Sequence, residues 1–256
     1  MRLSHTTPAI VLRTWPFSES DKIVSFLTEK HGKITGIAKG AKRSSKRFCN
    51  SLEPFSLVNV RFQDRAHSSL AFILTSDLLL GFKRLVISLE KISFASYLVE
   101  ITDGLIGERE ENPLVFHHLR DGLSYLEEKA TSLTFLTSFE LKLLRLAGYQ
   151  PLLEGCRRCG KDRQDQSAAR WHFSLRDGGI LCESCSRLRK EIMPLAAATL
   201  EVLTGLQEEK NMLSSTVSLK SSVLKEIRPV MFRFIQFHME REIKSASFLH
   251  KFSSVV

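Results

Sequence analysis

Residues 23–38 read IVSFLTEKHGKITGIA, two apolar runs on either side of the turn-forming residues His31-Gly32-Lys33. Short apolar runs bounded by glycine are typical of β-strands joined as a hairpin. Further runs lie at 9–12, 57–62 and 70–75. We therefore expect five short strands in residues 1–80, and five strands in so short a segment favour a small barrel of the oligonucleotide-binding (OB) type.

The segment that follows the third run is strongly basic. The 256-residue chain has a formal net charge of +9, and residues 1–80 hold twelve Lys and Arg against six Asp and Glu. Lys30 to Arg47 contains seven bases and no acid. Such density is tolerated most readily where phosphates neutralise it, so we look for function in the loop 39–48 and include Lys33, Lys46 and Arg47 on charge alone. The alternative is a solvated loop that contacts nothing.

Aromatic side chains near this loop are candidates for stacking on bases. They are Trp15, Phe48, Phe55 and Phe62. Phenylalanines at strand spacing usually point inward, so we expect most of them in the core. Trp15 precedes Pro16 in an expected loop and can lie outside the core.

The pattern changes from strands to helices after residue 80. Apolar residues recur at three and four positions over 85–105, Asn112-Pro113 is a typical helix start, and a third helix is expected over 133–147. Pro194 is expected to open a further helix, and a last helix over 217–243 contains Pro229, which should kink or divide it. The expected class is α+β, with domains at 1–80, 81–153, 154–190 and 191–256.

Two cysteine pairs, Cys156/Cys159 and Cys182/Cys185, each have the Cys-x-x-Cys spacing. Two such turns supply the four sulfur ligands of a closed tetrahedral zinc site. The spacer of 22 residues, Gly160 to Leu181, can form a hairpin that turns at Asp177-Gly178-Gly179. We expect one structural Zn²⁺; two disulfides, or thiols paired by chance, are the alternative.

The sequence argues against catalysis. Four thiolates leave no open position on zinc, and the His-x-Glu motif of zinc deaminases occurs only at 238–240, after both cysteine pairs instead of before them. Nucleotide-binding glycine motifs and a Gly-x-Ser-x-Gly motif are absent from the sequence. No apolar run reaches the length of a membrane span, and no secretory signal opens the chain, so we expect a cytoplasmic binding protein.

Several segments together resemble the RecO family of bacterial recombination mediators. The N-terminal ones are AIVLR (9–13), ESDKIV (19–24), LTEKHGKI (27–34), AKGAKR (38–43) and LEPF (52–55). The later ones are FELKLL (139–144), AGY (147–149) and PLL (151–153), followed by the cysteine pairs. The likeness therefore spans most of the chain in the right order.

The resemblance implies an OB barrel, then a helical domain with an inserted zinc module. It implies binding of single- and double-stranded DNA, strand annealing, and loading of RecA with RecR, and often RecF, onto DNA coated by single-strand binding protein. The motif shared with the family also implies that Lys39, Lys42 and Arg43 contact DNA. The resemblance further implies a protein associated with the nucleoid. Lys142 and Arg145 are candidates for the site that binds the acidic tail of single-strand binding protein. The rival interpretation is a zinc-containing RNA-binding or ribosome-associated factor.

Overall fold

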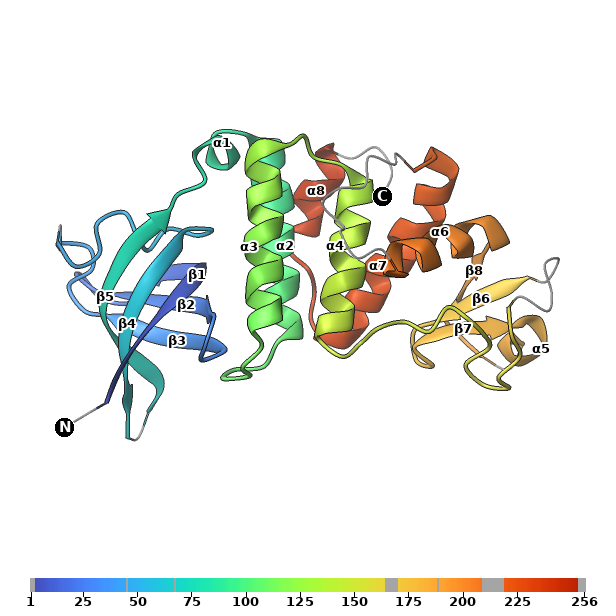
Figure 1. Ribbon diagram of the computed structural model, residues 1–256, viewed down its shortest axis with the longest axis horizontal. Helices are drawn as coiled ribbons and strands as arrows, with labels where there is room; N and C mark the ends of the chain where they lie inside the picture. Colours follow the sequence, from blue (N-terminus) through green and yellow to red (C-terminus); the bar gives the residue numbers. More distant parts are fainter. Residues whose placement is uncertain are drawn as a thin grey trace. The chain divides into compact units, whose positions relative to one another are not determined.

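A computed structural model describes residues 3–44, 46–66, 68–163, 170–187, 189–208 and 219–252 (Figure 1). Its contacts divide the chain into two units, Met1–Ala130 and Thr131–Val256. The first two long helices therefore fall into the same unit as the N-terminal strands. The division into four domains expected from the sequence stays a prediction.

The N-terminal strands form a closed five-stranded barrel in the order β1-β2-β3-β5-β4. The strands are β1 (Ser4–Pro16), β2 (Lys22–Thr28), β3 (Lys33–Ala38), β4 (Leu57–Arg65) and β5 (Ser68–Leu80). β4 pairs with β1 and so closes the barrel. The pairing of β3 with β5 is parallel, and the other pairings in the barrel are antiparallel. The expected OB-type barrel is confirmed.

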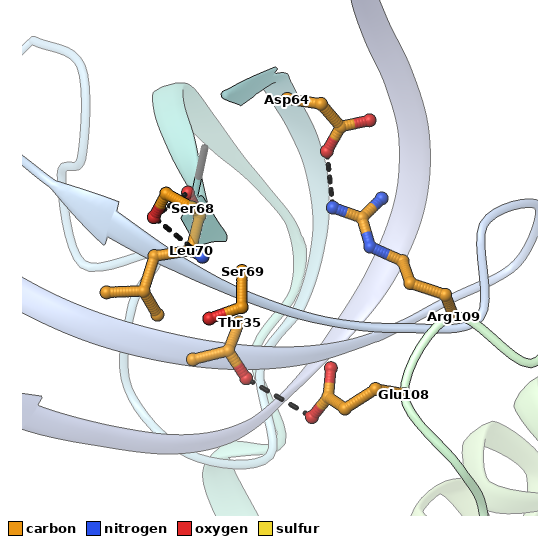
Figure 2. Close-up of a pocket in the computed structure, with 7 residues that line it drawn as sticks. All are labelled: Thr35, Asp64, Ser68, Ser69, Leu70, Glu108 and Arg109. Atoms are coloured by element: carbon orange, nitrogen blue, oxygen red, sulfur yellow. Dashed lines mark hydrogen bonds and ion pairs between the residues drawn. The ribbon is translucent and has the colours of Figure 1, made fainter. Parts of the chain in front are cut away.

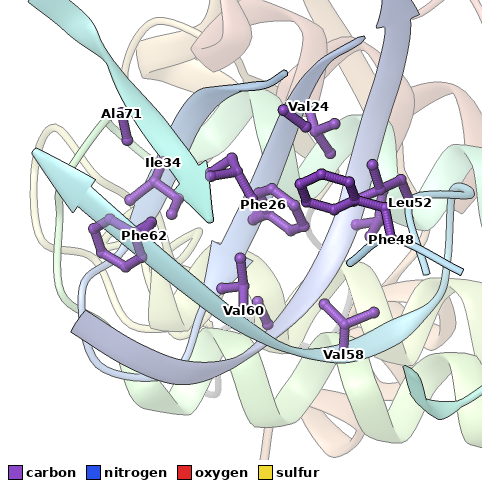
Figure 3. Packing of buried hydrophobic residues seen from close by; sticks show 13 residues of the cluster. Val24, Phe26, Ile34, Phe48, Leu52, Val58, Val60, Phe62 and Ala71 are labelled. Atoms are coloured by element: carbon purple, nitrogen blue, oxygen red, sulfur yellow. The ribbon is translucent and has the colours of Figure 1, made fainter. Parts of the chain in front are cut away.

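Alternating apolar side chains fill the barrel, as Figure 3 shows. Phe26, Ile34, Val60 and Phe62 are fully buried there. Between β2 and β3, Gly32 adopts a φ of +61°, and a Cβ at this position would lie 2.3 Å from the carbonyl oxygen of Glu110. Only glycine fits this turn without a shift of the neighbouring backbone.

Helices cover part of the barrel wall. They are α1 (Lys83–Val86), α2 (Leu89–Leu105) and α3 (Pro113–Glu128), and α2 and α3 contact β1 while α3 also contacts β2. The side chain of Asn112 caps α3 at its expected start, and that of Ser88 caps α2. The single helix expected over 85–105 is divided into α1 and α2. Six of the seven residues of β2 and five of the six of β3 are buried. Neither strand presents an open face to a ligand.

The second unit has a helical core. Its helices are α4 (Leu133–Leu146), α6 (Ala197–Glu208), α7 (Ser221–Met239) and α8 (Ala246–Phe252). α7 runs through Pro229 without a division into two helices. The buried carboxylate of Glu140 in α4 pairs with both terminal nitrogens of Arg228 in α7, at 2.5 and 3.0 Å. This ion pair fixes α4 against α7.

The cysteine-containing segment forms a small sheet in the order β7-β6-β8. Strands β6 (Trp171–Ser174) and β7 (Gly179–Cys182) make the expected hairpin, and the short helix α5 (Glu183–Ser186) follows. Pro194 does not open a helix as expected. It lies in β8 (Ile192–Leu195), opposite His172, and α6 begins only at Ala197. β8 is an edge strand, where a residue without an amide proton is tolerated.

Among the residues placed in these elements, no helix has the length and apolar character needed to cross a membrane.

Candidate nucleic-acid interface and metal site

The basic loop, which we define as residues 39–48, leaves the barrel at the end of β3 and is held in place at both ends. At its start, the amide of Gly40 donates to Asp21 at 2.8 Å, and the amide of Lys42 donates to the carbonyl of Ser20 at 2.9 Å. At its end, Phe48 inserts into the barrel core and is only 4% exposed (Figure 3). The start of the loop is therefore fixed to the β1–β2 connection and its end to the barrel core.

The carboxylate of Asp21 contributes electrostatically to this attachment. The hydrogen bond from the Gly40 amide, with smaller contributions from Ser20, Ser18 and the charge of Lys39, lowers the pKa of Asp21. The carboxylate is therefore ionised at neutral pH. It orients the start of the loop while the cations beyond it stay on the outside.

Five of the six cations expected to contact DNA project from this loop with exposed side chains: Lys39, Lys42, Arg43, Lys46 and Arg47. Lys42 donates to the carbonyl of Ser18, and Arg43 lies 3.9 Å from the highly exposed Glu19. In the described chain, no carboxylate lies within 4.0 Å of the ammonium group of Lys39 or Lys46. The loop thus presents a concentrated positive charge that its own protein compensates only weakly.

Lys33, the sixth of these cations, lies apart from the basic loop. Its ammonium group donates to the carbonyl of Asp103 at 2.7 Å and pairs with the Asp103 carboxylate at 3.3 Å. Glu108 lies 3.9 Å away, and the Lys33 side chain is 11% exposed. Because these contacts join β3 to α2, we leave Lys33 out of the interface proposed below.

Exposed aromatic rings lie next to the basic loop at the end of β1. Trp15 is 39% exposed and Phe17 is 58% exposed, and the amide of Phe17 bonds to the carbonyl of Asp21. Phe48 and Phe62 are core residues instead. Phe17 was missed from the sequence, although its place after Trp15-Pro16 in a connection between strands was a usable signal.

A separate open groove of about 680 Å³ lies on the barrel wall, as Figure 2 shows. Asp64 pairs with Arg109 on one side, and Thr35 donates to Glu108 at 3.4 Å on the other. Two carboxylates and a single cation already paired with one of them give this groove no positive charge to offer a phosphate. We do not place the nucleic-acid interface here.

The four paired cysteines come together in the second unit. Their sulfur atoms all lie within 4.8 Å of one another, and the sulfurs of Cys159 and Cys182 are 3.8 Å apart. Cys182 ends β7 and Cys185 lies one turn later in α5, while Cys156 and Cys159 occupy a turn closed by the amide of Gly160. Four converging thiols at this spacing fit a tetrahedral metal ion.

The surroundings of the thiols favour a bound cation. Burial raises the pKa of Cys156, but hydrogen bonds from the amides of Cys159, Cys182 and Arg158 outweigh it and bring the value to about 6. Burial and the neighbouring sulfur atoms raise the pKa of Cys185 to about 12. Several thiolates at this spacing repel one another, and a metal ion bound between the four sulfur atoms would compensate their charge.

Lys142 and Arg145 lie on α4, three residues apart and hence on neighbouring positions of one helix face. Lys142 is half-buried and Arg145 is exposed. Nothing else in the structure singles them out, so their assignment stays a prediction.

Comparison with known proteins covers nearly the whole chain. The family model described as Recombination protein O N terminal matches residues 1–82, and Recombination protein O C terminal matches residues 88–247. The chain is 32% identical to the DNA repair protein RecO of Syntrophus aciditrophicus over 97% of its own length and 96% of that protein. It is 31% identical to the DNA repair protein RecO of Caldanaerobacter subterraneus, over 96% and 98%.

The names of these relatives and of the family refer to DNA repair and recombination.

Proposed function

Because the chain belongs to the RecO family of DNA repair proteins, we propose that it is a recombination mediator that anneals complementary strands and helps load RecA onto DNA coated by single-strand binding protein. It would bind single- and double-stranded DNA in the cytoplasm, at the nucleoid. The proposed protein partners are RecR, the acidic tail of single-strand binding protein and, in part of the family, RecF. RecA is loaded onto the DNA without a direct contact to this chain.

The observation that carries this proposal is the basic loop on the OB barrel. Five exposed cations contact the sugar-phosphate backbone and displace its counterions, which gives affinity without sequence preference. Trp15 and Phe17 stack on unpaired bases beside the loop. Since the faces of β2 and β3 are closed, the strand binds at the loop end of the barrel and not across the sheet.

The mechanism needs no bond to be broken. A strand held at the loop meets a second strand, or a protein-coated strand, at a raised local concentration, and base pairing then completes the reaction. Lys142 and Arg145 are proposed as cationic contacts for the acidic tail of single-strand binding protein. Their spacing on α4 allows both to face one peptide.

The direct test is annealing of complementary oligonucleotides coated beforehand with single-strand binding protein. The chain should accelerate annealing, and Lys39→Ala/Lys42→Ala/Arg43→Ala should lose most of that acceleration. The control variant Lys129→Ala/Lys225→Ala removes exposed lysines from the C-terminal end of α3 and from α7, and it should behave like the wild type. Equal rates with and without the protein would contradict the proposal.

We further propose that Cys156, Cys159, Cys182 and Cys185 hold one structural Zn²⁺. The ion would supply folding energy to the module and, with all four positions filled by sulfur, no catalytic water. Metal analysis should find one zinc per chain, and Cys182→Ser should lose it together with the native fluorescence of the buried Trp171, which pairs with Cys182. Metal-free protein with two disulfides would overturn this assignment.

A further inference from the structure

A second concentration of positive charge surrounds the turn between β6 and β7. The hairpin-turn cluster, as we call it, consists of Arg157, Arg158, Arg176, Arg189 and Lys190 around the carboxylate of Asp177. Arg189 pairs with Asp177 at 2.8 Å, and the Nε of Arg157 donates to the Asp177 carbonyl at 3.2 Å. Asp177 thus contacts two of these cations, Arg189 through its carboxylate and Arg157 through its backbone carbonyl.

Asp177 is a fixed part of this arrangement and not a competitor for a ligand. Its side chain is 13% exposed, and it accepts a hydrogen bond from Ser174 at 2.6 Å. Burial raises the pKa of Asp177, but the bonds from Ser174 and Arg189 and the charge of Arg158 outweigh it, so the pKa is lowered. These contacts occupy the carboxylate of Asp177. The positive charge of the surrounding cations therefore exceeds the single negative charge among them.

The cluster borders a cleft of about 390 Å³. Arg176, Arg189 and Lys190 line it together with Ser174, Leu175 and Glu191, whose carboxylate is the acid in the lining. Arg176 and Lys190 are exposed, and in the described chain no carboxylate lies within 4.0 Å of either. The Nε of Arg189 is buried without a hydrogen-bond partner among the described residues. The cleft therefore offers a ligand the charge and the hydrogen-bond donors of the exposed Arg176 and Lys190.

We propose that the hairpin-turn cluster is a second polynucleotide site, which takes the phosphodiester backbone of a second strand. Four of its five cations are arginines, whose planar guanidinium groups bind phosphate with two parallel hydrogen bonds. The cations come from the first cysteine turn, the hairpin turn and the segment after α5, so they suit an extended anion with several charges. This inference rests on the proposed DNA-binding function. It places the second of the two annealing strands at the hairpin-turn cluster.

The basic loop and the hairpin-turn cluster belong to different units of the chain. A protein with one backbone-binding site on each unit can hold two strands at once. Their encounter then becomes intramolecular, which raises the annealing rate without any contact to the bases.

The test uses the full chain and two non-complementary oligonucleotides of about 15 nucleotides, one carrying a donor dye and one an acceptor. Energy transfer reports both strands on one molecule. Arg176→Ala/Lys190→Ala should leave binding of the first strand unchanged and weaken binding of the second strand about 25-fold at about 0.1 M salt. Each lost phosphate contact lowers the slope of log K against log salt by ~0.7, so two contacts correspond to a factor of ~10^1.4 at this salt concentration. Lys129→Ala/Lys225→Ala is the matched control, and unchanged Trp171 fluorescence shows that the module is folded.

The outcomes separate the two proposals. If the wild type binds no oligonucleotide, the proposed function fails. If it binds one strand but never two, or if Arg176→Ala/Lys190→Ala holds two strands as well as the wild type, the cluster is not a polynucleotide site. Binding of polyglutamate to the cleft as tightly as an oligonucleotide would also overturn the inference, since it would assign the cluster to an acidic protein.

Discussion

Replacing Glu140 by Gln should destabilise the second unit by about 3–5 kcal/mol. The Glu140 side chain is 0% exposed and that of Arg228 is 1% exposed, and the two meet through two hydrogen bonds at 2.5 and 3.0 Å. Glutamine keeps the shape of the side chain but removes its charge. The guanidinium charge then stays inside the unit without the carboxylate that balances it, and its desolvation cost is no longer offset.

The assay is urea unfolding followed by the fluorescence of Trp171, in a Trp15→Phe background that leaves one reporter. Trp171 is buried, and the neighbouring Phe173 contacts Phe234 of α7, so the signal reports on the helical core. With a urea dependence of about 2 kcal/mol/M, the midpoint should fall by about 2 M. Glu201→Gln, an exposed position on α6, is the control and should change stability by less than about 0.5 kcal/mol.

A double substitution separates the charge from the packing. Glu140→Leu/Arg228→Met removes both charges and should be far more stable than Glu140→Gln, because a buried ion pair contributes little compared with an apolar pair of similar volume. Binding of a single strand at the basic loop should not change in either variant, since that loop belongs to the other unit. A Glu140→Gln midpoint within about 0.5 M of the wild type would refute the reasoning.

Two further predictions concern exposed aromatics and pH. Trp15→Ala/Phe17→Ala should weaken binding of single-stranded DNA at least tenfold, at about 1–3 kcal/mol per stacked base, and leave binding of duplex DNA nearly unchanged; equal losses for both would argue against stacking. Burial lowers the pKa of His238, which stacks on Tyr149 at 4.3 Å, so the unfolded chain binds the proton more readily than the folded one. Stability of the wild type should therefore fall as pH drops below about 6.5, and this fall should be smaller in His238→Phe when unfolding is measured by urea at several pH values.

Most of the first unit could be predicted from its sequence because local signals agree with the tertiary structure there. Apolar runs of strand length, the Gly32 turn and the Asn112-Pro113 cap each determine conformation by themselves. The ends of the strands were less predictable. β1 extends from Ser4 to Pro16 because β4 pairs with its first half and β2 with its second, and pairing partners are not visible in a local pattern.

The second unit shows where local signals mislead. Pro194 has the look of a helix start, but pairing with β6 places it in an edge strand. Pro229 was expected to kink or divide the last helix, and α7, which packs against α4 and α6, runs through it without a division.

The candidate site was also only partly visible in the sequence. The cysteine spacing predicts the cluster directly, because each pair places two thiols on one turn. Charge density predicts the basic loop, but it does not show which cations already have an ion-pair partner. Lys33 was therefore grouped with the loop cations, although it pairs with Asp103 instead. The hairpin-turn cluster was not anticipated, since its cations come from three segments that only the fold brings together.

The salt dependence of single-strand binding tests the central claim most directly. With five loop cations engaged, the logarithm of the binding constant should fall with the logarithm of salt concentration with a slope of about −3.5, at −0.7 per contact. Lys39→Ala/Lys42→Ala/Arg43→Ala should reduce the slope to about −1.4, while Lys129→Ala/Lys225→Ala keeps it. A wild-type slope near zero, or the same slope in the loop variant, would contradict binding of the DNA backbone at the basic loop.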